Sequence, residues 1–237
     1  LRRDDHRRWI GGDVELRGQR RGLRRPGAVV ALGLRRQSAI GGWFDFDRDG
    51  DLDLVTTSIY GAALLINTGE GDVPFVFHPS VLDNFDDVRD LAPGDFDLDG
   101  DVDLALLRRN YRGNALLRND GGVLAVANSP LTQALDDVAT GCWGYLDEDH
   151  YPELFVGNVT LSNNRMYLND GGVLFLDAES PTSDPLGTQS CAWGDFDGDG
   201  DFDLFIGKEH SFSGIPNPAP LQNRLFTNED GVLVSID

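Results

Sequence analysis

The chain has 237 residues, of which 40% are hydrophobic, so it is long and apolar enough to bury a sizeable core. It carries 40 acidic and 20 basic side chains, which gives a formal net charge of −20. Such a negative surface repels a phosphate backbone and excludes nucleic acid as a partner. No stretch is long and apolar enough to form a membrane-spanning helix.

The N-terminal segment, residues 1–37, has a composition of its own. Residues 1–40 contain 11 arginines and only four acidic residues. Residues 9–16 weakly resemble a turn-and-strand pattern that recurs further along the chain. Three interpretations stay open: a remnant strand of a preceding repeat, a disordered arm, or a misplaced gene boundary.

A ten-residue segment that begins at Asp45 returns almost unchanged at Asp95 and Asp195, and a degraded copy begins at Tyr145. The four starts define a constant period of 50 residues. In each intact copy, carboxylates fall at positions 1, 3, 5, 7 and 9, and glycine falls at position 6. A repeat of this regularity indicates one structural unit used four times.

The spacing of these carboxylates predicts a calcium site in each intact copy. Calcium takes six to eight oxygen ligands, and a loop that reverses around the ion supplies them from alternate residues. Position 7 contributes its backbone carbonyl, and the glycine permits the sharp turn. The predicted ligands are Asp45, Asp47, Asp49, Asp51 and Asp53; Asp95, Asp97, Asp99, Asp101 and Asp103; and Asp195, Asp197, Asp199, Asp201 and Asp203.

Apart from Tyr151 at position 7, the third copy departs from this pattern at two positions. Tyr145 replaces the first carboxylate and His150 replaces the turn glycine, while Asp147, Asp149 and Glu153 remain. Tyrosine is a poor hard-cation ligand, and a side chain at position 6 resists the geometry of the turn. We therefore expect about three calcium sites, with the third copy weak or lost.

The flanks of the loops predict strands, which excludes an EF-hand. An EF-hand needs a bidentate Glu at position 12 between two helices, whereas position 12 here is Thr56, Leu106 or Ile206. Alternating apolar residues lead out of each loop. A third apolar stretch then ends in Asn and a turn, as in Asn119-Asp120-Gly121-Gly122, which is a hairpin signal. Each repeat thus predicts four antiparallel strands.

The segment Trp-Gly-Asp-Phe-Asp-Gly-Asp-Gly-Asp-Phe-Asp-Leu at 193–204, followed by Asn223 to Asn228, resembles the FG-GAP/VCBS repeat family. This family includes the β-propeller of the integrin α-subunit. The resemblance covers residues 38–237; the first copy departs from it with Phe44 where the others have Gly. It implies an all-β propeller with calcium bound between the first and second strands of each blade. The predicted blades are 38–86, 87–136, 137–186 and 187–237, as part of a seven- or eight-bladed ring.

The same resemblance implies a recognition, adhesion or scaffolding role outside the cell. We predict a secreted or cell-surface location, with the periplasm as an option, and a protein or carbohydrate ligand besides the missing blades of the parent chain. The sequence contains no recognised catalytic motif, so we predict a non-enzyme. The alternative is the propeller or sugar-binding part of a carbohydrate-active enzyme.

Three further features lie outside the metal motif. Cys142 and Cys191 occupy neighbouring offsets in adjacent repeats, so they form either a disulfide or two small buried side chains. The repeated tryptophans, Trp43, Trp143 and Trp193, predict packing between blades. The insertion at 211–220 is without a counterpart in the other repeats, and long loops often carry binding residues. Phe212 and Ile215 are its candidate ligand contacts.

Overall fold

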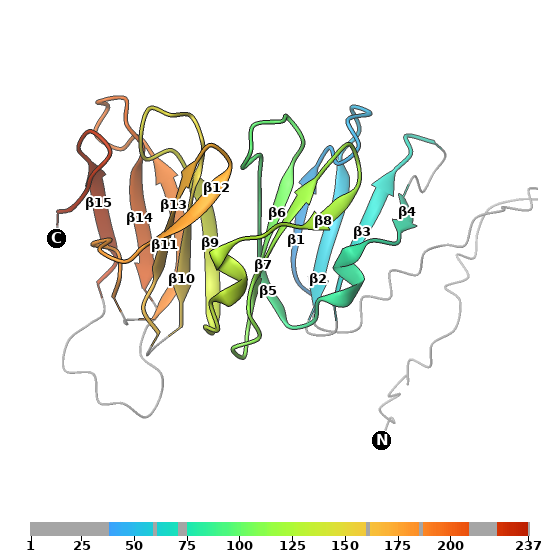
Figure 1. The fold of residues 1–237 in the computed structure, drawn as a ribbon, viewed down its shortest axis with the longest axis horizontal. Helices are drawn as coiled ribbons and strands as arrows, with labels where there is room; N and C mark the ends of the chain where they lie inside the picture. Colours follow the sequence, from blue (N-terminus) through green and yellow to red (C-terminus); the bar gives the residue numbers. More distant parts are fainter. Residues whose placement is uncertain are drawn as a thin grey trace, which may run out of the picture.

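A computed structural model describes residues 38–58, 61–70, 75–159, 162–184, 187–208 and 222–236. The described residues form sixteen strands in four sheets (Figure 1). The first sheet holds β1 (Ser38–Phe44), β2 (Asp53–Ser58), β3 (Gly61–Asn67) and β4 (Phe75–His78). The second holds β5 (Val88–Gly94), β6 (Asp103–Arg108), β7 (Ala115–Asn119) and β8 (Leu124–Val126). The third holds β9 (Val138–Gly144), β10 (Glu153–Asn158), β11 (Arg165–Asp170) and β12 (Val173–Asp177), and the fourth β13 (Thr188–Gly194), β14 (Asp203–Lys208), β15 (Arg224–Asn228) and β16 (Leu233–Ser235).

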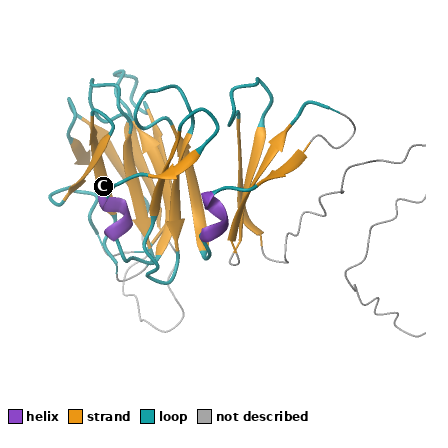
Figure 2. Ribbon diagram, turned by 45° about the vertical axis from the view of Figure 1, so that its right-hand side comes forward, coloured by secondary structure: helices purple, strands orange, loops and turns teal. Residues whose placement is uncertain are grey.

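Each sheet is an antiparallel meander in which every strand pairs with the next one along the chain. This confirms the predicted blades of four antiparallel strands. Two short 3₁₀ helices, η1 (Val81–Asn84) and η2 (Pro130–Gln133), follow the first and second sheets (Figure 2). Ser80 and Ser129 begin them, because each hydroxyl accepts a hydrogen bond from a backbone N–H of the first turn. In the described part of the chain, no helix is long and apolar enough to cross a membrane.

The four sheets stand side by side, with the first and fourth at opposite ends of the row (Figure 1). Their first strands are neighbours in chain order, β1 with β5, β5 with β9 and β9 with β13. A separate buried cluster lies at each of the three junctions, where side chains of two adjacent sheets meet. Leu64 and Leu106 belong to the first cluster, for example, and both are fully buried. Stacked four-stranded sheets with their cores between them are the construction of a β-propeller, and the ring of seven or eight blades stays a prediction.

A tryptophan seals two of the three junctions by covering a glycine of the preceding sheet. Trp143 lies over Gly94 and donates its indole N–H to the carbonyl of Ala92 at 3.0 Å. Trp193 lies over Gly144 and donates to the carbonyl of Cys142 at 3.3 Å. The prediction that these two tryptophans pack between blades is confirmed.

At the first junction the large residue lies on the preceding sheet and the smaller one on the following sheet, the reverse of the other two junctions. Phe44 stands at the glycine position and is buried, while Pro93 stands at the tryptophan position. The departure of Phe44 from the repeat pattern therefore accompanies a smaller residue in the facing strand. For Trp43 the packing prediction stays untested, because no sheet precedes β1 among the described residues. Its side chain is 56% exposed, and its ring lies 5.7 Å from that of Phe75 in its own sheet.

A disulfide joins the third and fourth sheets. Cys142 of β9 and Cys191 of β13 are bonded, with their Cα atoms 6.2 Å apart. Of the two interpretations left open by the sequence, the structure shows the disulfide. It links first strands that lie next to each other, so it ties the two sheets together near the loops described next.

Candidate metal-binding loops

Each predicted calcium loop joins the first and second strands of a sheet, as expected. The loops span residues 45–52, 95–102, 145–152 and 195–202, and all four project from the same end of the row, at the top of Figure 1. The position-6 glycines have φ of 94° at Gly50, 88° at Gly100 and 106° at Gly200. Only glycine adopts this region freely, so the backbone turn explains the glycine of the motif.

The position-9 carboxylate anchors each intact loop to the sheet. Asp103 is fully buried, and its two oxygens accept hydrogen bonds from the backbone N–H groups of Phe96 at 3.0 Å and Asn119 at 2.8 Å. Asp53 and Asp203 make the same pair of bonds in their own sheets. One carboxylate thus holds the loop against the third strand, so the loop keeps its shape.

The structure brings predicted ligands together in all four loops. One carboxylate oxygen from each of three residues lies within 4.8 Å of the other two in every cluster. Two oxygens bound to one calcium ion lie at most about 5 Å apart, because each bond is about 2.3–2.6 Å long. The four clusters are Asp45, Asp47 and Asp53; Asp95, Asp97 and Asp99; Asp147, Asp149 and Glu153; and Asp195, Asp197 and Asp199.

Two further observations show that a cation fits these clusters. Among the described residues, one oxygen each of Asp45, Asp95 and Asp97 is buried without a hydrogen-bond partner. A buried, unpaired carboxylate oxygen is costly unless an ion or a donor reaches it. Burial and the negative charges of Asp99 and Asp95 also raise the pKa of Asp97, and burial raises the pKa of Asp103 to about 7. A divalent cation would reverse both effects by favouring the ionised form.

The side chains at position 7 lie apart from the clusters that the structure forms. Asp101 is buried; it accepts a hydrogen bond from the backbone N–H of Gly121 at 2.8 Å and pairs with Arg48 of the first loop at 2.6 Å. This arrangement leaves the backbone carbonyl as the position-7 group available to an ion. The position-1 carboxylates of Asp45 and Asp95 accept from the position-6 N–H, at 3.0 and 2.9 Å, which closes the loop.

The third loop keeps its cluster despite the two substitutions. His150 adopts a left-handed φ of 71°, so the resistance expected of a side chain at this position does not prevent the turn. Tyr145 faces the ring of Phe202 in the next loop, with ring centroids 6.0 Å apart. Burial and the charges of Asp147 and Asp149 raise the pKa of Glu153 to about 7. Three carboxylates therefore converge here, as in the clusters of the intact loops, although this copy lacks the carboxylates of positions 1 and 7.

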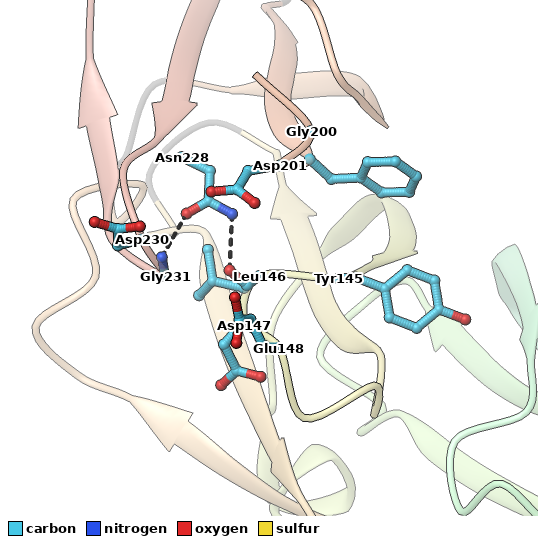
Figure 3. Close-up of a pocket in the computed structure, with 10 residues that line it drawn as sticks. Tyr145, Leu146, Asp147, Glu148, Gly200, Asp201, Asn228, Asp230 and Gly231 are labelled. Carbon is cyan, nitrogen blue, oxygen red and sulfur yellow. Dashed lines mark hydrogen bonds between the residues drawn. The ribbon is translucent and has the colours of Figure 1, made fainter. Parts of the chain in front are cut away.

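In the second, third and fourth sheets, an asparagine at or next to the end of the third strand links neighbouring loops, a role that the sequence analysis did not assign. Asn119 donates its side-chain N–H to the carbonyl of Phe46 in the preceding loop at 2.9 Å. Asn169 and Asn228 make the same bond, to Phe96 at 2.8 Å and to Leu146 at 2.7 Å (Figure 3). The signal was the recurrence of an Asn just before a glycine-containing turn in every repeat. The predicted contacts Phe212 and Ile215 lie outside the described residues.

Comparison with known proteins identifies the repeats. The profile of the FG-GAP-like repeat matches residues 45–106 and 145–206, which together make up just over half of the chain. Each match begins at the first residue of a loop and ends within the second strand of the following sheet. No curated protein matches the sequence. On the strength of the repeat profile and of the four loop-bearing sheets, the chain belongs to the FG-GAP-like repeat family.

Proposed function

We propose that this protein is a calcium-stabilised propeller module that binds a partner outside the cytoplasm. The observation that carries the proposal is the convergence of carboxylates in four equivalent loops, with buried oxygens left unpaired in the first two. Calcium bound there would hold each hairpin and neutralise charges that otherwise repel one another. Three intact sites and a weaker fourth follow from the ligand sets.

A binding role fits the family. Domains built from FG-GAP repeats are generally propeller-type binding or adhesion modules and are typically not catalytic. The rigid stack of sheets presents loops at both ends, which is where such scaffolds carry their contacts. The ligand is a protein or carbohydrate in our proposal.

Two features support a location outside the cytoplasm. The bond between Cys142 and Cys191 is typical of an oxidising compartment. Calcium sites of extracellular modules bind at about 10⁻⁴ to 10⁻³ M, a range that only a calcium-rich environment saturates. Secretion to the cell exterior, or to the periplasm, provides both conditions.

Calorimetric titration of calcium into chelator-stripped protein tests the metal part of the proposal, with thermal melts in calcium and in chelator. We expect three strong sites, a weaker fourth and a higher melting temperature in calcium. Asp97→Asn should remove one site and part of the stabilisation. Asp83→Asn, an equal charge change on exposed η1, should leave the stoichiometry unchanged. A folded protein that binds no calcium, or an Asp97→Asn variant with unchanged stoichiometry, would rule out the assignment.

A further inference from the structure

A pocket of about 430 Å³ opens between the third and fourth loops (Figure 3). Three segments line it: residues 145–148 of the third loop, residues 200–202 of the fourth loop, and the turn at 228–231. It lies at the loop-bearing end of the molecule, at the junction that the disulfide ties together. The pocket therefore lies between two sheets that a covalent bond holds together.

The lining combines two aromatic rings with several carboxylates. Tyr145 and Phe202 are 46% and 40% exposed, and their tilted rings have centroids 6.0 Å apart. Glu148, Asp201 and Asp230 add carboxyl groups around them. Rings attract cations through their faces, and carboxylates bind guanidinium groups through charge-assisted hydrogen bonds. The lining is therefore suited to an organic cation.

An arginine of this chain occupies the equivalent place at the first junction. At the first junction Arg48, the fourth residue of its loop, reaches across to the second loop. Its guanidinium donates to the carbonyls of Gly100 at 3.1 Å and Asp99 at 2.8 Å, and it pairs with Asp101 at 2.6 Å. At the third junction the residue equivalent to Arg48 is Glu148. The corresponding acceptors, Gly200 and Asp201, line the pocket instead.

The equivalence of the two junctions rests on their hydrogen bonds as well as on the repeat. Asn119 and Asn228 donate to the carbonyls of Phe46 and Leu146, the second residues of the preceding loops. Each Asn also accepts from the backbone N–H three residues later, at 2.9 Å in both cases. The two junctions therefore have the same backbone arrangement. They differ in the fourth residue of the preceding loop, which is Arg48 at the first junction and Glu148 at the third.

The turn at the third junction carries an additional carboxylate. Asp230 has a φ of 52° and stands where the second sheet has Gly121, whose φ is 58°. Asp tolerates this left-handed conformation better than most residues do, although glycine suits it best. The change from glycine to aspartate adds negative charge to the lining, in the same direction as the change from Arg48 to Glu148.

We propose that this pocket binds the guanidinium group of an arginine side chain on a protein partner. The proposal deepens the binding role proposed above and depends on it. The arginine takes the place that Arg48 fills at the first junction: it pairs with Asp201, donates to the carbonyls of the fourth loop and stacks on Tyr145 and Phe202. Arg48 also lies 3.9 Å from a carboxylate oxygen of Asp99 in the second loop's cluster, so the bound arginine would lie next to the fourth loop's cluster.

The test is a titration of the full chain, in saturating calcium, with the capped peptide Gly-Arg-Gly and with its citrulline counterpart, which has the same shape without the charge. We expect the arginine peptide to bind at least tenfold more tightly than the citrulline peptide, with Asp201→Asn weakening it at least tenfold. Agmatine, a free guanidinium compound, serves as a third probe. Equal binding of the citrulline peptide would overturn the recognition of a cation, and agmatine binding as tight as that of the peptide would overturn the protein partner.

Glu148→Arg provides the sharpest variant, because it rebuilds the first junction at the third. We expect it to abolish peptide binding and to raise the melting temperature, as the new arginine fills the pocket. Glu70→Arg, the same charge change on an exposed turn of the first sheet, should leave peptide binding unchanged. Peptide binding that survives Glu148→Arg would overturn the assignment. Thermal melts with and without calcium on the same samples test calcium stabilisation independently of peptide binding. A failure of the calcium proposal can therefore be distinguished from a failure of the arginine proposal.

Discussion

Gly144 lies beneath the indole ring of Trp193, and no space exists there for a methyl group. A Cβ atom placed on Gly144 would overlap three atoms of the ring. Gly194 stands at the same register position in the next sheet, yet among the described residues no atom lies within 4 Å of a Cβ placed on it. Neither glycine has a left-handed φ, so alanine is compatible with both backbones. Alanine substitutions at Gly144 and Gly194 therefore separate the effect of packing on stability from the effect of backbone conformation.

Gly144→Ala should destabilise the protein, and Gly194→Ala should not. Forcing a methyl group into a packed site costs about 1–3 kcal/mol. Displacing the ring also breaks its hydrogen bond to Cys142, a further loss of about 0.5–1.5 kcal/mol. At Gly194 the loss of backbone freedom in the unfolded chain should stabilise by about 0.4–1 kcal/mol. Gly144→Ala gains the same unfolded-chain term, which cancels, so the two variants should differ by about 1.5–4.5 kcal/mol. This corresponds to about 3–18 °C in melting temperature at about 2–4 °C per kcal/mol.

Urea denaturation followed by circular dichroism measures this difference, and a double-mutant cycle identifies its source. In a Trp193→Ala background, Gly144→Ala should cost less than in the native protein, because the ring that it displaces is absent. The packing argument fails if Gly144→Ala and Gly194→Ala have equal stability, or if the cost of Gly144→Ala is the same with and without Trp193.

Three other features give predictions of their own. Asn119→Ala leaves the carbonyl groups of two adjoining loops unpaired, so the free energy of unfolding should fall by about 1–3 kcal/mol for each buried group, measured in urea. In chelator, stability should fall between about pH 4.3 and about pH 7, because burial raises the pKa of Glu153 to about 7. The stabilisation is complete below the unfolded value of about 4.3 and is lost as the pH rises through about 7. Melts across this range should be flatter for Glu153→Gln, and a slope equal to that of the native protein would exclude Glu153 as the source. Replacing Cys142 and Cys191 together by Ser should cost about 4 kcal/mol by the chain-entropy relation for a separation of 49 residues, and reducing agent should abolish the difference between the variant and the native protein.

The fold could be predicted because its signals are local. Alternating apolar residues define a strand without reference to the rest of the chain, and a glycine with positive φ defines a turn. The loop that begins at Asp95 shows both: Gly100 turns the chain, and β6 follows with alternating contacts to the two sides of its sheet. Repetition at a fixed period then supplies the number of strands in each sheet.

Apart from the packing of Trp143 and Trp193, the contacts between sheets could not be predicted, because they depend on which faces meet. Cys142 and Cys191 are bonded only because β9 and β13 are neighbours, and the repeat spacing alone left their pairing open. Trp43 has the same sequence context as Trp143 but is exposed, since the described residues place no glycine of a preceding sheet beneath it. The reach of Arg48 into the second loop likewise requires the relative position of two sheets.

The exchange of Phe44 and Pro93 at the first junction has a consequence for assembly. At the other two junctions a tryptophan meets a glycine, so the contact faces of the four sheets are not interchangeable. If the third sheet followed the first, Trp143 would meet the bulk of Phe44 in place of the open surface of Gly94. A wrongly ordered stack, or an exchange of sheets between two chains, would encounter this steric conflict. The bulk of one residue on each face therefore distinguishes the first junction from the other two and disfavours a stack in which the first sheet is followed by the third or the fourth.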